Sequence, residues 1–139
     1  MKKNLNLLVI LSILFLAACG PGNGSSATIN IKIDDFSFSP SQFTVPAGTE
    51  ITVNATNQGS VTHNFIIMKL GSDVGHEFDD EDQPNVYWEM EIQAGDSQAF
   101  TFTTPEQPGV YQILCGMPGH LPAGMFGTVT VVSPSGKTK

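Results

Sequence analysis

Apolar and polar residues alternate along most of the chain after residue 27. The clearest runs are residues 29–33, 51–56, 100–103, 111–115 and 129–131. In each run, β-branched or aromatic side chains alternate with polar ones, which is typical of a strand with one buried face. Turn-forming Pro, Gly and Asn residues separate the runs, and no long helical periodicity is present. We therefore predict an all-β protein of about seven short strands, arranged as an antiparallel, Greek-key sandwich of two sheets.

Residues 71–90 interrupt this pattern. Six carboxylates fall between Asp73 and Asp82, and their spacing does not match a calcium-binding EF-hand loop. We predict an acidic loop that is inserted between strands and exposed to solvent. The more specific alternative is that this loop is a docking surface for a basic partner. His76 lies among the carboxylates, where an exposed histidine is the expectation and a secondary metal site the alternative.

The N-terminus has the pattern of an export signal. Two lysines precede an apolar stretch that is too short for a membrane span and ends in Leu16-Ala17-Ala18-Cys19. This ending resembles a bacterial lipobox, although an ordinary signal with a chance cysteine would look similar. We predict a signal peptide over residues 1–18, lipidation of Cys19, and a flexible Gly- and Ser-rich tether over residues 19–27. The domain would occupy residues 28–133, and residues 134–139 would form a short tail. The lipid would anchor the protein to the cell membrane, facing the periplasmic or extracellular side.

Length and charge narrow the possible functions. The 139 residues suffice for one domain, and the formal net charge is −7 with no arginine. Without Lys2 and Lys3, four lysines face thirteen carboxylates, a net charge of −9. Nucleic acid is therefore excluded as a partner, because its phosphates require a basic surface. Three histidines and two cysteines are too few for a multi-copper enzyme or a disulfide-rich scaffold.

One short segment collects side chains that bind transition metals. Cys115, His120 and Met125 follow the predicted strand at 110–114 with the spacing Cys-x4-His-x4-Met. His63 lies on an earlier predicted strand, at a position expected to face the core. A thiolate, two imidazoles and a thioether are the ligands of a mononuclear blue copper site, whereas structural zinc sites rarely include a thioether. We predict that these four side chains bind one copper ion; the alternative is that they are core residues.

Two segments resemble bacterial cupredoxins of the auracyanin, azurin and plastocyanin group. They are SPSQFTVPAGTEITVNATNQGSVTHNF, which leads to His63, and PGVYQILCGMPGH, which contains Cys115 and His120. The resemblance implies a trigonal plane of His63, Cys115 and His120 with Met125 as the axial contact. It also implies that Asn64 supports the site by a backbone N–H to the Cys sulfur and a side-chain tie between the ligand loops.

The sequence departs from the family pattern at two positions. Gly116 stands where many relatives have a Ser or Thr that receives the Asn64 tie. Met117 stands where azurins have Phe, and is a second candidate for the axial contact. Met125 has the family spacing, so we assign the axial role to Met125.

The resemblance implies a one-electron carrier rather than an enzyme. Four protein ligands would leave copper no open position, and no nucleophile–base pair is evident. Electrons would pass at the edge of His120 through an apolar patch of Met117, Pro118, Leu121 and Pro122. The expected partners are a c-type cytochrome or a quinol-oxidising membrane complex, with the protein as a monomer. A lipoprotein for copper delivery or storage and a metal-free scaffold are the alternatives.

Overall fold

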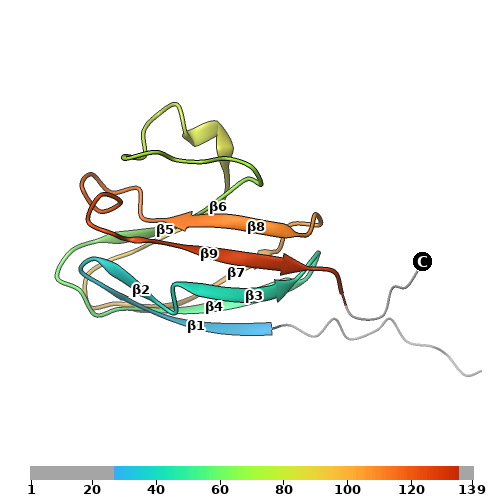
Figure 1. The fold of residues 1–139 in the computed structure, drawn as a ribbon. Helices are drawn as coiled ribbons and strands as arrows, with labels where there is room; N and C mark the ends of the chain where they lie inside the picture. Colours follow the sequence, from blue (N-terminus) through green and yellow to red (C-terminus); the bar gives the residue numbers. More distant parts are fainter. Residues whose placement is uncertain (1–26, 135–139) are drawn as a thin grey trace, which may run out of the picture.

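The computed structural model describes residues 27–134, which form two β-sheets packed face to face (Figure 1). The elements of this part of the chain are, in order, β1 (Ala27–Asp34), β2 (Ser37–Ser39), β3 (Gln42–Pro46), β4 (Glu50–Asn57), β5 (His63–Met68), the 3₁₀ turn η1 (Gln83–Asn85), β6 (Val86–Ile92), β7 (Ser97–Thr103), β8 (Gly109–Leu114) and β9 (Phe126–Val132). One sheet has the strand order β2-β1-β4-β7 and the other β3-β9-β8-β5-β6. The predicted all-β, two-sheet sandwich is confirmed.

The pairing differs from the prediction in one respect. β1 pairs with β4, and β3 with β9, in parallel, so the expectation of antiparallel pairing was wrong for these two pairs. The remaining strand pairs are antiparallel. Alternation of apolar residues reports which face of a strand is buried, but it contains no information about the direction of the neighbouring strand.

The main core lies between the two sheets. Inward-facing residues of both sheets fill it, among them Ile31, Val53, Phe65, Ile113 and Val129, each at most 1% exposed. Cys115 and Met125 belong to the same cluster and are fully buried. Two of the four predicted metal-binding residues are therefore part of the hydrophobic core.

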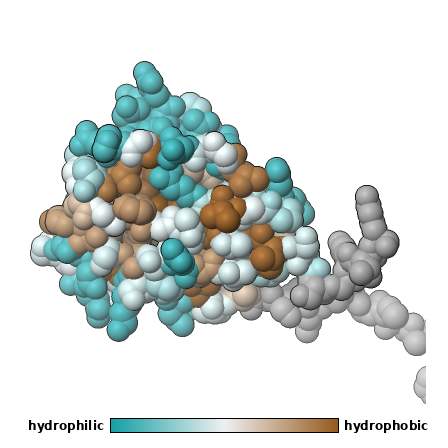
Figure 2. Space-filling model, viewed as in Figure 1, coloured by the Kyte–Doolittle hydropathy of each residue, from teal (hydrophilic) through white to brown (hydrophobic). Residues whose placement is uncertain are grey.

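The acidic loop between β5 and β6 covers the outer face of the five-stranded sheet. Val74 and the partly buried Phe78 pack against Ile66, Leu114 and Leu121 in a second hydrophobic cluster. The loop forms the hydrophilic cap above β5 and β8 in Figures 1 and 2. The carboxylates of this segment are mostly exposed, as expected. The loop is nevertheless more than a solvated surface, because its apolar residues give β5 a second buried face.

The two ends of the sandwich differ in role. The loop that joins β8 to β9 lies at one end, whereas β1 begins and β9 finishes at the opposite end (Figure 1). The predicted signal peptide, Cys19, the tether before residue 27 and the tail from residue 135 lie outside the described residues. Within residues 27–134, no helix is long and apolar enough to cross a membrane.

Candidate metal centre

Three of the predicted ligands converge at the loop end of the sandwich. His63 is the first residue of β5 and Cys115 directly follows β8, which is the neighbour of β5 in the sheet. Both side chains are fully buried. His120 lies in the loop between β8 and β9 and is partly exposed. Their ligand atoms lie within 4.8 Å of one another.

The distances suit one shared metal ion. His63 Nδ1 lies 3.1 Å from His120 Nδ1, Cys115 Sγ lies 3.2 Å from His120 Nδ1, and Sγ lies 3.9 Å from His63 Nδ1. Donor atoms with metal bonds of about 2.0–2.3 Å lie at most about 4.6 Å apart across one ion. Both imidazoles therefore present Nδ1, and the thiol presents its sulfur, to the same small volume.

Backbone hydrogen bonds close the loop that bears the ligands. The N–H of Cys115 donates to the carbonyl of Met125 at 3.1 Å, and the N–H of Met125 donates to the carbonyl of His120 at 3.1 Å. Gly119 and Gly124 have φ values of 82° and 103°, and this loop conformation disfavours any residue with a Cβ. Met125, fully buried, thus lies beside Cys115 and His120, and the four predicted ligands lie close together.

Asn64 connects β5 to the loop between β8 and β9, here called the ligand loop (residues 115–125), although Gly116 has no side chain to receive the bond. The Asn64 Oδ1 accepts a hydrogen bond from the backbone N–H of Gly116 at 2.6 Å. A Cβ on Gly116 would lie 2.7 Å from Cδ1 of Phe78 and 2.8 Å from Cδ1 of Ile66. The acidic loop therefore fills the space that a Ser or Thr side chain would need, and the backbone makes the tie instead.

Burial shifts the pKa values of two ligands, Cys115 and His120. Desolvation raises the pKa of the Cys115 thiol, while backbone N–H groups of Met117 and Asn64 act in the opposite direction. Burial, and then the proximity of His63, lowers the pKa of His120. The imidazole of His120 therefore stays neutral to lower pH than usual. A bound metal ion would stabilise the Cys115 thiolate, the form that coordinates.

The expected electron-transfer surface requires one correction. Pro118 and Pro122 are exposed and Met117 is partly buried against the main core. Leu121, by contrast, is only 7% exposed because it belongs to the second cluster beneath the acidic loop. His76 is exposed and lies outside the His63–Cys115–His120 group.

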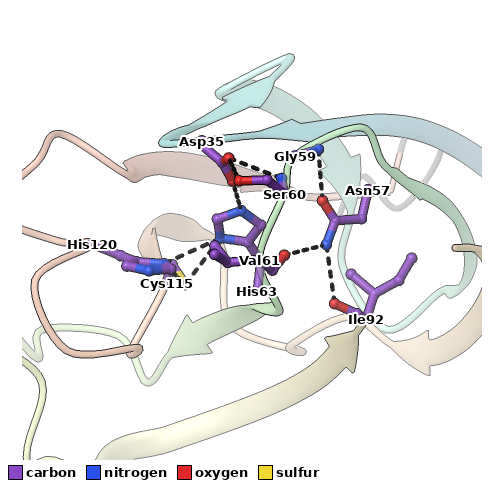
Figure 3. A network of polar contacts seen from close by, with 9 residues as sticks. All are labelled: Asp35, Asn57, Gly59, Ser60, Val61, His63, Ile92, Cys115 and His120. Carbon is purple, nitrogen blue, oxygen red and sulfur yellow. Dashed lines mark hydrogen bonds and ion pairs between the residues drawn. The ribbon is translucent and has the colours of Figure 1, made fainter. Parts of the chain in front are cut away.

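The structure adds two residues that the sequence pattern did not reveal. Asp35 Oδ1 lies 2.8 Å from Nε2 of His63 (Figure 3). The ring of Phe36 lies against that of His120 with centroids 4.7 Å apart, and Phe36 is 42% exposed. Both belong to the turn between β1 and β2. This turn is far from the ligands in the sequence and meets them only in the folded chain.

Fold and donor set together define a protein with a type 1 copper site on a cupredoxin scaffold. Two nitrogens, one thiolate and one thioether suit copper in both of its oxidation states. The family model for the cupredoxin-like domain matches residues 6–131, so the chain belongs to that family.

Individual relatives agree with this assignment. Auracyanin-B of Chloroflexus aurantiacus is 31% identical over 83% of this chain, although the match spans only 59% of auracyanin-B. Reduced auracyanin from Roseiflexus castenholzii has a similar structure, with a TM-score of 0.64 and 33% identity over 78% of this chain and 99% of that one. The copper-resistant cuproprotein CopI of Rubrivivax gelatinosus is 26% identical over 80% of this chain and 71% of its own length.

Proposed function

We propose that this protein is a one-electron carrier that moves electrons between redox proteins at a membrane surface. The observation that supports this most directly is the convergence of His63 Nδ1, Cys115 Sγ and His120 Nδ1 at 3.1–3.9 Å, with Met125 beside them. Copper bound by these residues would supply a Cu(I)/Cu(II) couple.

The protein scaffold suits electron transfer because it limits movement. His63, Cys115 and Met125 are fully buried, and hydrogen bonds fix both ligand segments. A fixed ligand set changes oxidation state with little rearrangement. Four protein ligands also leave no position for a substrate, which argues against an enzyme.

The exposed edge of His120 is the proposed route for electrons. Phe36 packs on its ring, and Pro118 and Pro122 are exposed nearby in the same loop. Such an apolar rim suits a small, short-lived redox interface. A c-type cytochrome or a quinol-oxidising membrane complex is the proposed class of partner, and the protein would act as a monomer.

A lipid anchor on Cys19 would orient the site. β1 begins at Ala27, and its eight residues run toward Asp35 beside His63. At about 3.3 Å per residue, this strand spans roughly 25 Å. The chain therefore enters the domain at the end far from His120, and the electron-transfer edge would face away from the anchoring membrane.

The decisive test is spectroscopic. The purified protein is titrated with Cu(II) and examined by visible absorption and EPR, before and after ascorbate. We expect an intense blue or green band and a narrow copper hyperfine splitting, both removed by reduction and restored by reoxidation. Cys115→Ser should abolish the band, whereas Met68→Leu, which changes a buried methionine away from the site, should retain it. Ordinary cupric spectra from the wild-type protein would refute the proposal.

Copper delivery or storage is a second candidate, favoured by the similarity to CopI. It uses the same ligands but requires copper to leave readily. The two functions separate in a chelator competition: a carrier retains copper through repeated cycles of reduction and reoxidation, whereas a delivery protein loses it to the chelator within a few cycles.

A further inference from the structure

The carboxylate of Asp35 is held against the far side of His63. Its Oδ1 lies 2.8 Å from His63 Nε2, and its Oδ2 accepts hydrogen bonds from the backbone N–H and the hydroxyl of Ser60 at 2.8 and 2.6 Å (Figure 3). Both oxygens are thus engaged. The Asp35 side chain is 27% exposed, whereas that of His63 is fully buried.

The turn that carries Ser60 is itself fixed. Asn57 is 1% exposed, and its amide donates to the carbonyls of Val61 and Ile92 at 2.8 and 3.2 Å. Its Oδ1 accepts from the N–H of Gly59 at 2.9 Å. A Cβ on Gly59 would lie 2.3 Å from Asp35 Oδ1 and 3.0 Å from His63 Nε2. The glycine therefore permits the close approach of the turn to the Asp35–His63 pair.

This contact selects the nitrogen that His63 offers to the metal. A carboxylate only accepts hydrogen bonds, so the proton of the neutral imidazole resides on Nε2. The lone pair is then on Nδ1, the nitrogen that faces Cys115 and His120. A carboxylate partner also makes a ligating imidazole a stronger donor.

We propose that Asp35 is a positioning residue of the copper site, which fixes the tautomer of His63 and favours Cu(II) over Cu(I). The inference rests on the proposed function. When a redox partner donates one electron, Cu(II) becomes Cu(I) and the site loses one positive charge. The Nε2 proton stays between His63 and Asp35. A fixed negative charge behind His63 therefore stabilises the oxidised form more than the reduced one.

Asp35→Asn tests the charge with little change in shape. We expect the ratio of Cu(I) to Cu(II) affinity to rise about tenfold, which corresponds to a rise in reduction potential of about 59 mV. Ser60→Ala removes one of the two donors to Oδ2 and should give a smaller rise. The matched control is Asp34→Asn, which removes an exposed neighbouring carboxylate and should leave the ratio unchanged. Equal ratios in Asp35→Asn and Asp34→Asn would overturn the proposal.

A second measurement does not need copper. Nitrogen-15 NMR of the metal-free protein at neutral pH should find the His63 proton on Nε2, and Asp35→Ala should produce a mixture of tautomers. A His63 tautomer unaffected by Asp35→Ala would overturn the assignment. If the wild-type protein shows no Cys-ligated copper spectrum, the proposed function fails, yet this tautomer measurement still decides whether Asp35 orients His63.

Discussion

Gly116 offers a sharp test of how the acidic loop and the ligand loop fit together. Its φ is not in the left-handed region, so an alanine there strains no backbone angle. The new Cβ would instead lie 2.7 Å from Cδ1 of Phe78 and 2.8 Å from Cδ1 of Ile66. We therefore expect Gly116→Ala to destabilise the protein through these contacts alone.

The magnitude follows from the surroundings. Ile66 is fully buried and Phe78 is half-buried in the same cluster, so neither side chain moves freely. Overpacking of this kind costs about 1–3 kcal/mol, which is several degrees in Tm for a domain of this size. Phe78→Ala removes the ring and leaves only a terminal methyl group of Ile66 in the way. In that background Gly116→Ala should cost less than about 1 kcal/mol.

Urea denaturation of the metal-free protein measures all four members of this double-mutant cycle. The control is Gly75→Ala in the acidic loop, where a Cβ meets nothing within 4 Å and φ is not in the left-handed region. It should change the free energy of unfolding by no more than about 0.5 kcal/mol. The reasoning fails if Gly116→Ala costs as much with Phe78 absent as with Phe78 present.

Three further predictions concern stability. Gly127→Ala should cost about 3 kcal/mol in urea denaturation, because its Cβ would lie 1.9 Å from the backbone oxygen of Ser41, which cannot rotate away; a near-neutral variant would contradict this packing. Asn57→Ala should cost about 3 kcal/mol in the same assay, because it leaves two carbonyls without their donor, and Asn57→Asp should not restore the wild-type value. Hydrogen bonds from Ser60, followed by that with His63, lower the pKa of Asp35 from 3.8 to about 2. Between these pH values the unfolded chain binds more protons, so the stabilisation by Asp35 is complete above about pH 4 and is lost as the pH falls through 2. The stability difference between wild type and Asp35→Asn should shrink over that interval, and a constant difference would show that the charge is not involved.

The sequence predicted the strands in which apolar residues recur at alternate positions. β1, β4, β7, β8 and β9 were found in this way, and β5 was predicted as the strand that carries His63. β2 was missed because three residues, Ser37–Ser39, are too short to show a period. β6 does alternate, with Trp88, Met90 and Ile92 directed toward the main core, but most of it was assigned to the acidic loop because the carboxylates before it dominate the composition.

The ligands were predictable because three of them lie within one short segment, whose spacing is local. Asp35 was not, since its contact with His63 spans 28 positions and depends on β1 ending where β5 begins, in two different sheets. The burial of Leu121 was missed for a related reason. Pro122 and Ala123, which follow it, are exposed, and only the cover provided by the acidic loop distinguishes Leu121 from them.

The acidic loop and the metal centre are parts of one packed structure. Val74 and Phe78 of the loop pack against Leu121 of the ligand loop, and Phe78 occupies the space beside Gly116. Val74 is also tied to β8, since its N–H donates to Oε1 of Gln112 at 3.0 Å. The carboxylates between residues 73 and 82 are therefore held at a fixed place beside the ligand loop.

The position of these carboxylates matters for the proposed steering of a redox partner. Salt screens interactions between exposed charges that are more than about 8 Å apart at physiological ionic strength. Only charges fixed close to the proposed electron-transfer edge at His120 can therefore steer a partner. If electron transfer with a basic partner slows as salt is added, disrupting the cluster with Phe78→Ala should weaken that salt dependence without changing the net charge.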